Sequence, residues 1–170
     1  TQDRAFEEFV RASEGVPRDA INVLALAAQR ALDEAISVEH IRLAARDWYQ
    51  RDKDKAVSTN TRAHELLHWI IDKVIGQRRA RAFLLRTGHN DALIEDLYDA
   101  RVLHVLKRNI STHDQPGVRY DVYKLDYGCY VDLINTVRAP SGLLPAGEGE
   151  DGGFVDVPPD DYRSIRRAIL

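Results

Sequence analysis

The chain has 170 residues, of which 44% are hydrophobic and 30% charged, and its formal net charge is −3. This is an ordinary globular composition, with enough length for one domain or two small ones. So small a net charge singles out neither nucleic acid nor a membrane as partner. A single cysteine excludes an internal disulfide and a cysteine-based zinc site. The single cysteine suits a reducing, cytoplasmic setting, and with no apolar run near the roughly 18 residues that span a bilayer we expect no membrane partner.

Residues 1–56 carry the patterns of three short helices, which we predict to form a first domain. Gly15 suits the position after the end of the first helix. Pro17 suits the start of the second, and Ser37 is a favourable N-cap for the third. The predicted inward faces are Phe6, Phe9, Val10 and Ser13, then Ile21, Leu24, Ala25, Ala28 and Leu32, and finally Ile41, Ala44, Ala45 and Trp48.

Five consecutive charged residues follow, at positions 51–55. Because such a run is poorly suited to packing in a core, we predict a linker and a domain boundary there. A solvated helix end is the alternative.

Residues 57–138 predict a second domain of mixed type. The patterns indicate a helix over 60–75 that ends at Gly76, a strand over 80–86, and a helix capped by Asn90 or Asp91 that runs through Tyr98. Strands over 102–110 and 118–127 flank a polar turn and form a hairpin, and 130–137 continues as a strand or a helical turn. Residues 139–170 predict a flexible loop and a docking helix that starts at Pro159 or Asp160. The expected fold class is therefore α+β, mainly α.

Residues 12–21 read Ala-Ser-Glu-Gly-Val-Pro-Arg-Asp-Ala-Ile. This run resembles the start of the sensor-2 helix in the lid of AAA+ ATPases. Residues 36–41, Ile-Ser-Val-Glu-His-Ile, resemble the opening of the lid's last helix. The resemblance implies that Arg18, following Gly15 and Pro17, binds nucleotide and senses the ATP γ-phosphate. A helix N-terminus favours anions, and an arginine adds a fork of donors; a plain surface arginine is the alternative.

The sequence has no Gly-x-x-x-x-Gly-Lys-Ser/Thr loop and no apolar strand that ends in paired acids. The resemblance therefore implies that ATP and Mg²⁺ bind to a missing upstream ATPase core, and that this segment alone binds no cofactor and has no catalytic residue. The chain also begins with Thr1 and contains no methionine. We expect an excised segment of a larger protein, with initiator removal as the alternative.

The second segment resembles the winged-helix domain that follows the lid in origin-recognition-like and STAND-type signalling ATPases. It departs from that pattern by leaving room for about one helix, where a full winged helix has two, between the first strand and the hairpin. The resemblance implies contact with a partner protein, a neighbouring subunit or DNA. The candidate contact residues are Arg78, Arg79, Arg81, Arg86, Lys107, Arg108 and Arg119. Acids at Asp91, Glu95, Asp96 and Asp99 on the candidate recognition helix oppose phosphate binding.

The run His64-Glu65-Leu66-Leu67-His68 matches His-Glu-x-x-His, in which two histidines bind zinc and the glutamate is the general base. Arg62 precedes the run and no Gly-x-x-His follows it, so we expect no metal and keep a zinc hydrolase as an alternative. We expect the tyrosines to pack in the core rather than to stack on bases, and Cys129 to be buried and unreactive. These tyrosines are Tyr120, Tyr123, Tyr127 and Tyr130.

Overall fold

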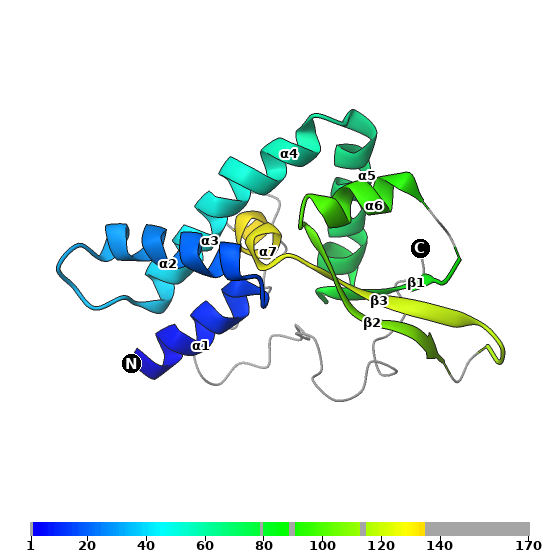
Figure 1. The fold of residues 1–170 in the computed structure, drawn as a ribbon, viewed down its shortest axis with the longest axis horizontal. Helices are drawn as coiled ribbons and strands as arrows, with labels where there is room; N and C mark the ends of the chain where they lie inside the picture. The colour runs from blue at the N-terminus through cyan, green and yellow to red at the C-terminus, as the bar shows by residue number, and fades with distance from the viewer. Residues whose placement is uncertain (1, 79, 89–90, 113–114, 135–170) are drawn as a thin grey trace.

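The computed structural model describes residues 2–78, 80–88, 91–112 and 115–134. Helices dominate this part of the chain and accompany one three-stranded antiparallel sheet (Figure 1), which confirms the expected α+β, mainly α class. No helix within the described ranges combines the length and the apolar character needed to cross a bilayer. The loop and docking helix expected over 139–170 lie outside these ranges.

Three helices form the N-terminal part, as expected: α1 (Gln2–Ser13), α2 (Pro17–Ala31) and α3 (Val38–Trp48). They contact one another pairwise and form a compact trio (Figure 1). Gly15 turns the chain between α1 and α2 with a φ of +72°, which glycine adopts without strain. The Ser37 Oγ accepts from the His40 backbone N–H at 3.2 Å, while His40 Nδ1 accepts from the Ser37 N–H at 3.3 Å. This capping box fixes the start of α3.

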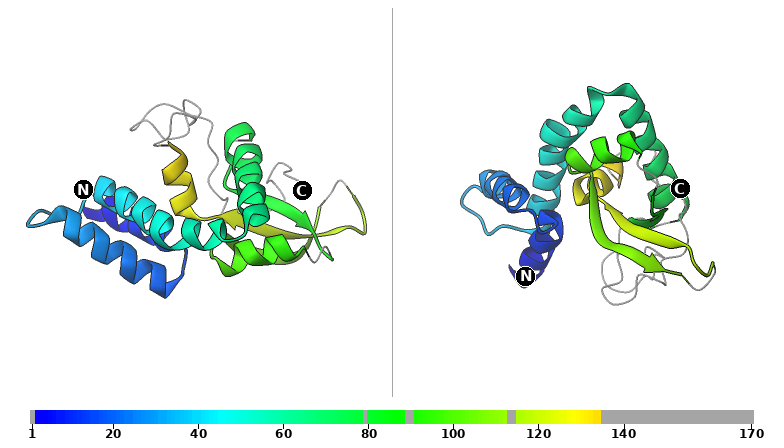
Figure 2. Two further views of the ribbon diagram at one scale, coloured as in Figure 1. Left: turned by 90° about the horizontal axis from the view of Figure 1, so that it is seen from above. Right: turned by 45° about the vertical axis from the view of Figure 1, so that its right-hand side comes forward.

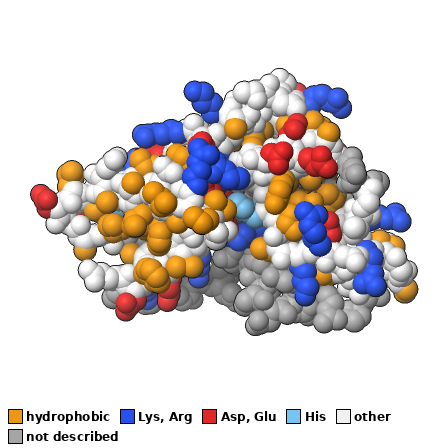
Figure 3. Space-filling view, viewed as in Figure 1, with side chains coloured by type: hydrophobic (Ala, Val, Ile, Leu, Met, Phe, Trp, Pro, Cys, Tyr) orange, Lys and Arg blue, Asp and Glu red, His pale blue; other side chains and the backbone are white. Residues whose placement is uncertain are grey.

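The predicted inward face is correct for α3, where Ile41, Ala44 and Ala45 are buried. It is wrong for most of the apolar residues of α1 and α2: Phe6 is 66% exposed, Ile21 69% and Leu32 84%. The buried positions are instead small or polar, namely Ala5, Glu8 and Ala12 of α1 and Asp19, Val23, Ala27 and Ala31 of α2. Alanines let the three helix axes approach closely, so the larger side chains point outward. Figure 3 shows hydrophobic side chains gathered on this half of the molecule.

The charged run does not form a linker. From α3 the chain continues through a π-helical segment, η1 (Tyr49–Asp54), into α4 (Lys55–Ser58). Within this run Lys53 is buried, because it finds two carboxylate partners. The expectation that the run cannot pack is therefore wrong, and the domain boundary near residue 56 stays a prediction.

The second part follows the expected order of elements. These are α5 (Thr61–Ile71), η2 (Asp72–Gln77), β1 (Ala82–Arg86), α6 (Ala92–Asp99), β2 (Leu103–Ser111), β3 (Arg119–Leu125) and α7 (Tyr127–Ile134). Asn60 and Asp91 cap α5 and α6 through their side-chain oxygens. The predicted end at Gly76 is one residue early, because η2 runs to Gln77. Of the segment 130–137, for which a strand or a helical turn is expected, residues 130–134 belong to helix α7 and the rest lie outside the described residues.

The sheet has the strand order β1-β3-β2. β2 and β3 form the expected hairpin, and β1 pairs antiparallel with the other edge of β3. Phe83 and Tyr123 are register partners whose rings stack at 5.7 Å. Helices α5 and α6 lie on one side of this sheet (Figures 1 and 2), where Leu67, Ile94 and Leu97 pack in the main core with Phe83. The sheet and its helices thus form a second layered unit.

Helix α7 returns from the end of β3 to the N-terminal trio and contacts α1 and α3 (Figure 1). The approach is close at Gly128, where an added Cβ would lie 2.5 Å from Tyr49 Cβ and 3.0 Å from the Ala45 carbonyl oxygen. Cys129 and all four tyrosines of the predicted cluster are buried, as expected. Helix α7 therefore fastens the sheet unit to the trio.

Replacement of Gly128 by alanine should destabilise the chain by about 2 kcal/mol, because the new methyl group must displace backbone or the buried Tyr49 side chain. The matched control is Gly76→Ala, where the nearest atom to an added Cβ is 4.0 Å away. That change should be neutral or stabilising by up to about 1 kcal/mol. Urea unfolding of both variants measures the difference, and equal stabilities would contradict the close approach.

Candidate functional site

Arg18 lies in the first turn of α2, directly after Pro17, and its side chain is 61% exposed. Its Nη2 donates to Asp52 Oδ1 at 3.1 Å. The guanidinium also lies over the Trp48 ring, 5.6 Å from the centroid, within the range of a cation–π contact. The predicted nucleotide sensor is thus accessible, and a carboxylate and an indole hold it at the surface.

Asp52 has a second cationic partner, Arg101, from the turn between α6 and β2. Arg101 Nη2 pairs with Asp52 Oδ2, and its Nη1 donates to Asp19 Oδ1 at 3.1 Å. The backbone of Arg101 has a φ of +60°, a region that costs free energy for a residue with a side chain. The two carboxylates hold Arg101 in this conformation, so they join the start of α2 to the start of the hairpin.

Lys53 is the centre of this arrangement. Its Nζ lies 2.7 Å from Asp19 Oδ2 and 2.6 Å from Asp126 Oδ1, and all three side chains are almost fully buried. The Trp48 indole donates to Asp19 Oδ1 at 2.9 Å, and His104 Nε2 lies 3.0 Å from Asp126 Oδ1. We call this set the junction network. Its members are Arg18, Asp19, Asp52, Lys53, Arg101, His104 and Asp126.

At the centre of the junction network, the surroundings favour the charged forms of both Lys53 and Asp126. Burial alone would lower the pKa of Lys53, but Asp126 and Asp19 raise it above its usual value. Burial alone would raise the pKa of Asp126, but Lys53 and His104 lower it to about 2. Near neutral pH the network therefore holds a lysine cation between two carboxylate anions.

A second buried ion cluster lies beside the first and involves Arg81. Arg81 Nη1 donates to Glu14 Oε1 at 3.1 Å, and Lys124 pairs with the other Glu14 oxygen. The Arg81 guanidinium lies over the Tyr127 ring, 5.5 Å from the centroid. The prediction that Arg81 contacts DNA or a partner is wrong, because Glu14 of the α1–α2 turn binds it inside the molecule.

Ligand atoms of Glu14, His104 and Asp126 lie within 4.8 Å of one another. That spacing suits a metal ion, but the carboxylates already have cationic partners. Arg81 and Lys124 neutralise Glu14, and Lys53 neutralises Asp126. A divalent cation would have to displace these groups, so we assign the three residues to the ion clusters.

The remaining predicted contact residues that the structure describes lie on the three strands of the sheet and at the end of η2. Arg78, Arg86, Lys107, Arg108 and Arg119 are all exposed. Arg79 lies outside the described residues. Arg108 is already paired with Asp121, at 3.2 Å.

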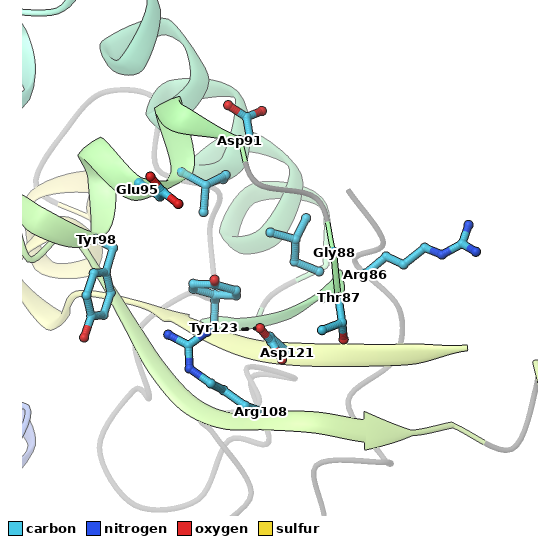
Figure 4. A pocket seen from close by; sticks show the side chains of 11 residues that line it. Arg86, Thr87, Gly88, Asp91, Glu95, Tyr98, Arg108, Asp121 and Tyr123 are labelled. Carbon is cyan, nitrogen blue, oxygen red and sulfur yellow. Dashed lines mark hydrogen bonds and ion pairs between the residues drawn. The ribbon is translucent and has the colours of Figure 1, made fainter. Parts of the chain in front are cut away.

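A cavity of about 230 Å³ lies between α6 and the sheet. Three of its lining residues are acidic: Asp91, Glu95 and Asp121. Figure 4 shows Arg108 directed toward Asp121 and Arg86 pointing away from the cavity. Glu95 of α6 and its N-cap residue Asp91 therefore line the same cavity as the hairpin arginine Arg108, which does not favour a phosphate backbone there.

The two histidines of the His-Glu-x-x-His run do converge. His64 Nε2 and His68 Nε2 are 3.3 Å apart, and Asp54 Oδ1 is 3.3 Å from the same His64 nitrogen. Glu65 is exposed and has no hydrogen bond or ion pair to any residue in the described ranges. The two predicted ligands thus come together without an ordered general base beside them.

No family model, curated protein or solved structure matches this chain.

Replacement of Lys53 by methionine should destabilise the chain by about 3–5 kcal/mol, because two buried carboxylates lose their shared cation. The matched control is Lys55→Met, two positions along, where the side chain is exposed and the expected change is within about 0.5 kcal/mol. Urea unfolding at pH 7 compares the two variants. Equal stability would mean that the Lys53 ion pairs do not hold the two units together.

The depressed pKa of Asp126 predicts a loss of stability in acid. Because its pKa is about 2 when folded against an ordinary 3.8, the charged form contributes about 2 kcal/mol above roughly pH 5. That contribution is lost as the pH falls from about 5 to about 2. Urea midpoints measured at pH 7, 5 and 3 should fall more steeply for the wild-type chain than for Asp126→Asn. Parallel declines would contradict this assignment.

Proposed function

We propose that this chain is the C-terminal regulatory and interaction region of an AAA+-type ATPase that acts in the cytoplasm. In this proposal α1–α3 form the lid, which senses nucleotide through Arg18. The unit of α5, α6 and the sheet is winged-helix-like and passes the nucleotide state to a partner. An upstream core supplies the phosphate-binding loop, ATP and Mg²⁺.

One observation carries the proposal: Arg18 and an exposed apolar stripe share one face of α2. Ile21, Ala25, Ala28 and Leu32 follow Arg18 at intervals of three, four, three and four residues, and all of them are exposed. An apolar stripe at this spacing normally packs against another element. A stripe that starts with an accessible arginine is suited to close over a nucleotide held by another part of the protein.

The surroundings of Arg18 support a role in phosphate sensing. Its present acceptor, Asp52, has Arg101 as a second partner, so Asp52 keeps a cation if Arg18 moves. The guanidinium and the free N–H groups at the start of α2 then offer donors to one phosphate group.

The junction network supports transmission to the second unit. Asp19 follows Arg18 in the same helical turn and binds both Lys53 and Arg101. Lys53 in turn binds Asp126, which lies between β3 and α7. A shift of the first turn of α2 therefore changes the contacts at the two ends of the hairpin.

The topology of the second unit supports the winged-helix proposal. A helix, a strand, one further helix and a hairpin occur in that order, and the first strand pairs with the last. The acids on α6 favour a protein partner or a neighbouring subunit over duplex DNA. DNA binding through Arg86, Lys107 and Arg119 is the alternative, and a gel shift at low salt tests it.

Replacement of Arg18 by alanine in the protein that carries this chain behind its core should lower ATP turnover about tenfold or more, because a donor to the transferred phosphate is lost. Arg18→Lys should restore part of the rate, because lysine keeps the charge without the fork. Steady-state ATPase rates at saturating ATP provide the measurement.

The control for this experiment is Arg51→Ala, an exposed arginine next to Asp52, which should leave turnover unchanged. Normal turnover in Arg18→Ala would remove the sensing role and leave the ATPase assignment open. Absence of ATP binding by the whole protein would remove the ATPase assignment itself.

A further inference from the structure

We propose that the cavity between α6 and the sheet binds a basic side chain, arginine or lysine, that a partner protein presents. This names the chemistry of the partner contact, and it rests on the proposed function for its biological setting. The cavity has a volume of about 230 Å³, which is less than the roughly 300–1,000 Å³ of sites for drug-sized ligands. A volume of this size suits one long side chain.

The interior of the cavity suits an aliphatic stem. Leu85 of β1, Ile94 of α6 and Tyr123 of β3 line it and are buried. Arginine and lysine carry about three or four methylene groups, which pack on apolar surface while the charged end stays near water. An apolar interior below a polar rim therefore matches the two parts of such a side chain.

Two aromatic side chains border the cavity. Tyr98 of α6 is 46% exposed, whereas Tyr123 of β3 is buried. Figure 4 shows Tyr98 and Glu95 on the α6 side of the cavity, opposite Tyr123. The face of an aromatic ring attracts a cation that lies within about 6 Å of its centroid. Both rings are therefore placed to contribute to the binding of an ammonium or a guanidinium group.

The charges around the cavity are unbalanced in favour of carboxylates. Asp121 already has a cation, because Arg108 Nη1 donates to its Oδ2 at 3.2 Å. Arg86 points away from the cavity (Figure 4). Asp91 and Glu95 have no counter-ion among the residues that the structure describes. A basic side chain that enters the cavity would supply the cation that these two carboxylates lack.

The surroundings of the Tyr123 hydroxyl agree with this charge balance. Burial and the charge of Asp121 raise its pKa, and Glu95 raises it as well, whereas Arg108 lowers it. Tyr123 is therefore neutral near pH 7 and adds no charge of its own. The carboxylates at the rim then determine the sign of the electrostatic potential in the cavity.

The mouth of the cavity favours a protein over a free amine as the source of the cation. Thr87 and Gly88 follow β1, line the cavity and are exposed. The Thr87 hydroxyl and the backbone of Gly88 can bond to the main chain of the segment that presents the basic side chain. A free amine has no such main chain and would leave these groups to water.

The experiment is a residue-resolved NMR titration of the chain with acetyl-Gly-Arg-Gly amide at pH 7 and low salt. We expect saturable shifts of the Gly88, Glu95 and Tyr98 amide signals, with a dissociation constant on the order of 1 mM. Glu95→Gln should weaken binding about fivefold, and Tyr98→Ala about threefold. Both side chains are exposed, so both variants should keep the fold.

Two matched controls isolate the cavity and the charge. Asp99→Asn removes an exposed carboxylate from the same helix outside the cavity, and this variant should bind the peptide as the wild-type chain does. The citrulline peptide has nearly the same shape without the charge and should bind at least fivefold more weakly. Absence of binding by the wild-type chain, equal binding of the two peptides, or equal losses in Asp99→Asn and Glu95→Gln would each overturn the proposal.

A third ligand distinguishes the two sources of the cation. Propylguanidine is the arginine side chain without a main chain, and it should bind more weakly than the arginine peptide. Equal or tighter binding would assign the cavity to a free amine and overturn the partner assignment. None of these titrations contains nucleotide, so their failure leaves the ATPase proposal standing, and the Arg18 variants test that proposal separately.

Discussion

The buried Lys53 ammonium is the contact on which the rest of the structure depends. A lysine is stable inside a protein only when carboxylates replace the water that it loses. Its two partners come from distant parts of the chain, Asp19 at the start of α2 and Asp126 between β3 and α7. The helical trio and the sheet unit cannot separate at this point without leaving charges buried and unpaired. Helix α7 packs across the same junction, so electrostatic and apolar contacts constrain the same geometry.

This constraint places the proposed sensing residue and a structural residue side by side. Arg18 faces solvent and Asp19 faces Lys53, although they are neighbours in one turn. Under the proposed function, a motion that carries Arg18 toward a phosphate also strains the Asp19–Lys53 pair. Arg101 binds the other carboxylate oxygen of both Asp19 and Asp52. Its backbone conformation is unfavourable by itself. A polar network that can adopt two discrete arrangements is the kind of element that couples two distant sites.

Local patterns in the sequence were sufficient for most helices and strands, but not for η1 and α4, and they were insufficient for the buried faces and the long-range contacts. The caps at Ser37, Asn60 and Asp91 were predictable because capping depends on neighbours in the chain. The hairpin was predictable from its turn and its Val- and Tyr-rich strands. The faces of α1 and α2 were not, because an apolar stripe looks the same whether it packs inside the chain or against another surface. Nor did the charged run reveal Lys53, whose carboxylate partners lie 34 and 73 positions away.

The π-helical turns of η1 have a consequence for how this region tolerates length changes. A π turn accommodates one residue more than an α turn of the same height. Deletion of one η1 residue other than Lys53 would let the segment relax into a regular α-helix. Because the removed residue is the one that the π turn added, the elements after it would keep nearly the same orientation about the helix axis. An insertion of one residue into the regular helix α3 would instead rotate everything after it by about 100° and turn Lys53 away from its carboxylate partners. Loss of a residue from η1 is therefore better tolerated than gain of a residue in the helix before it.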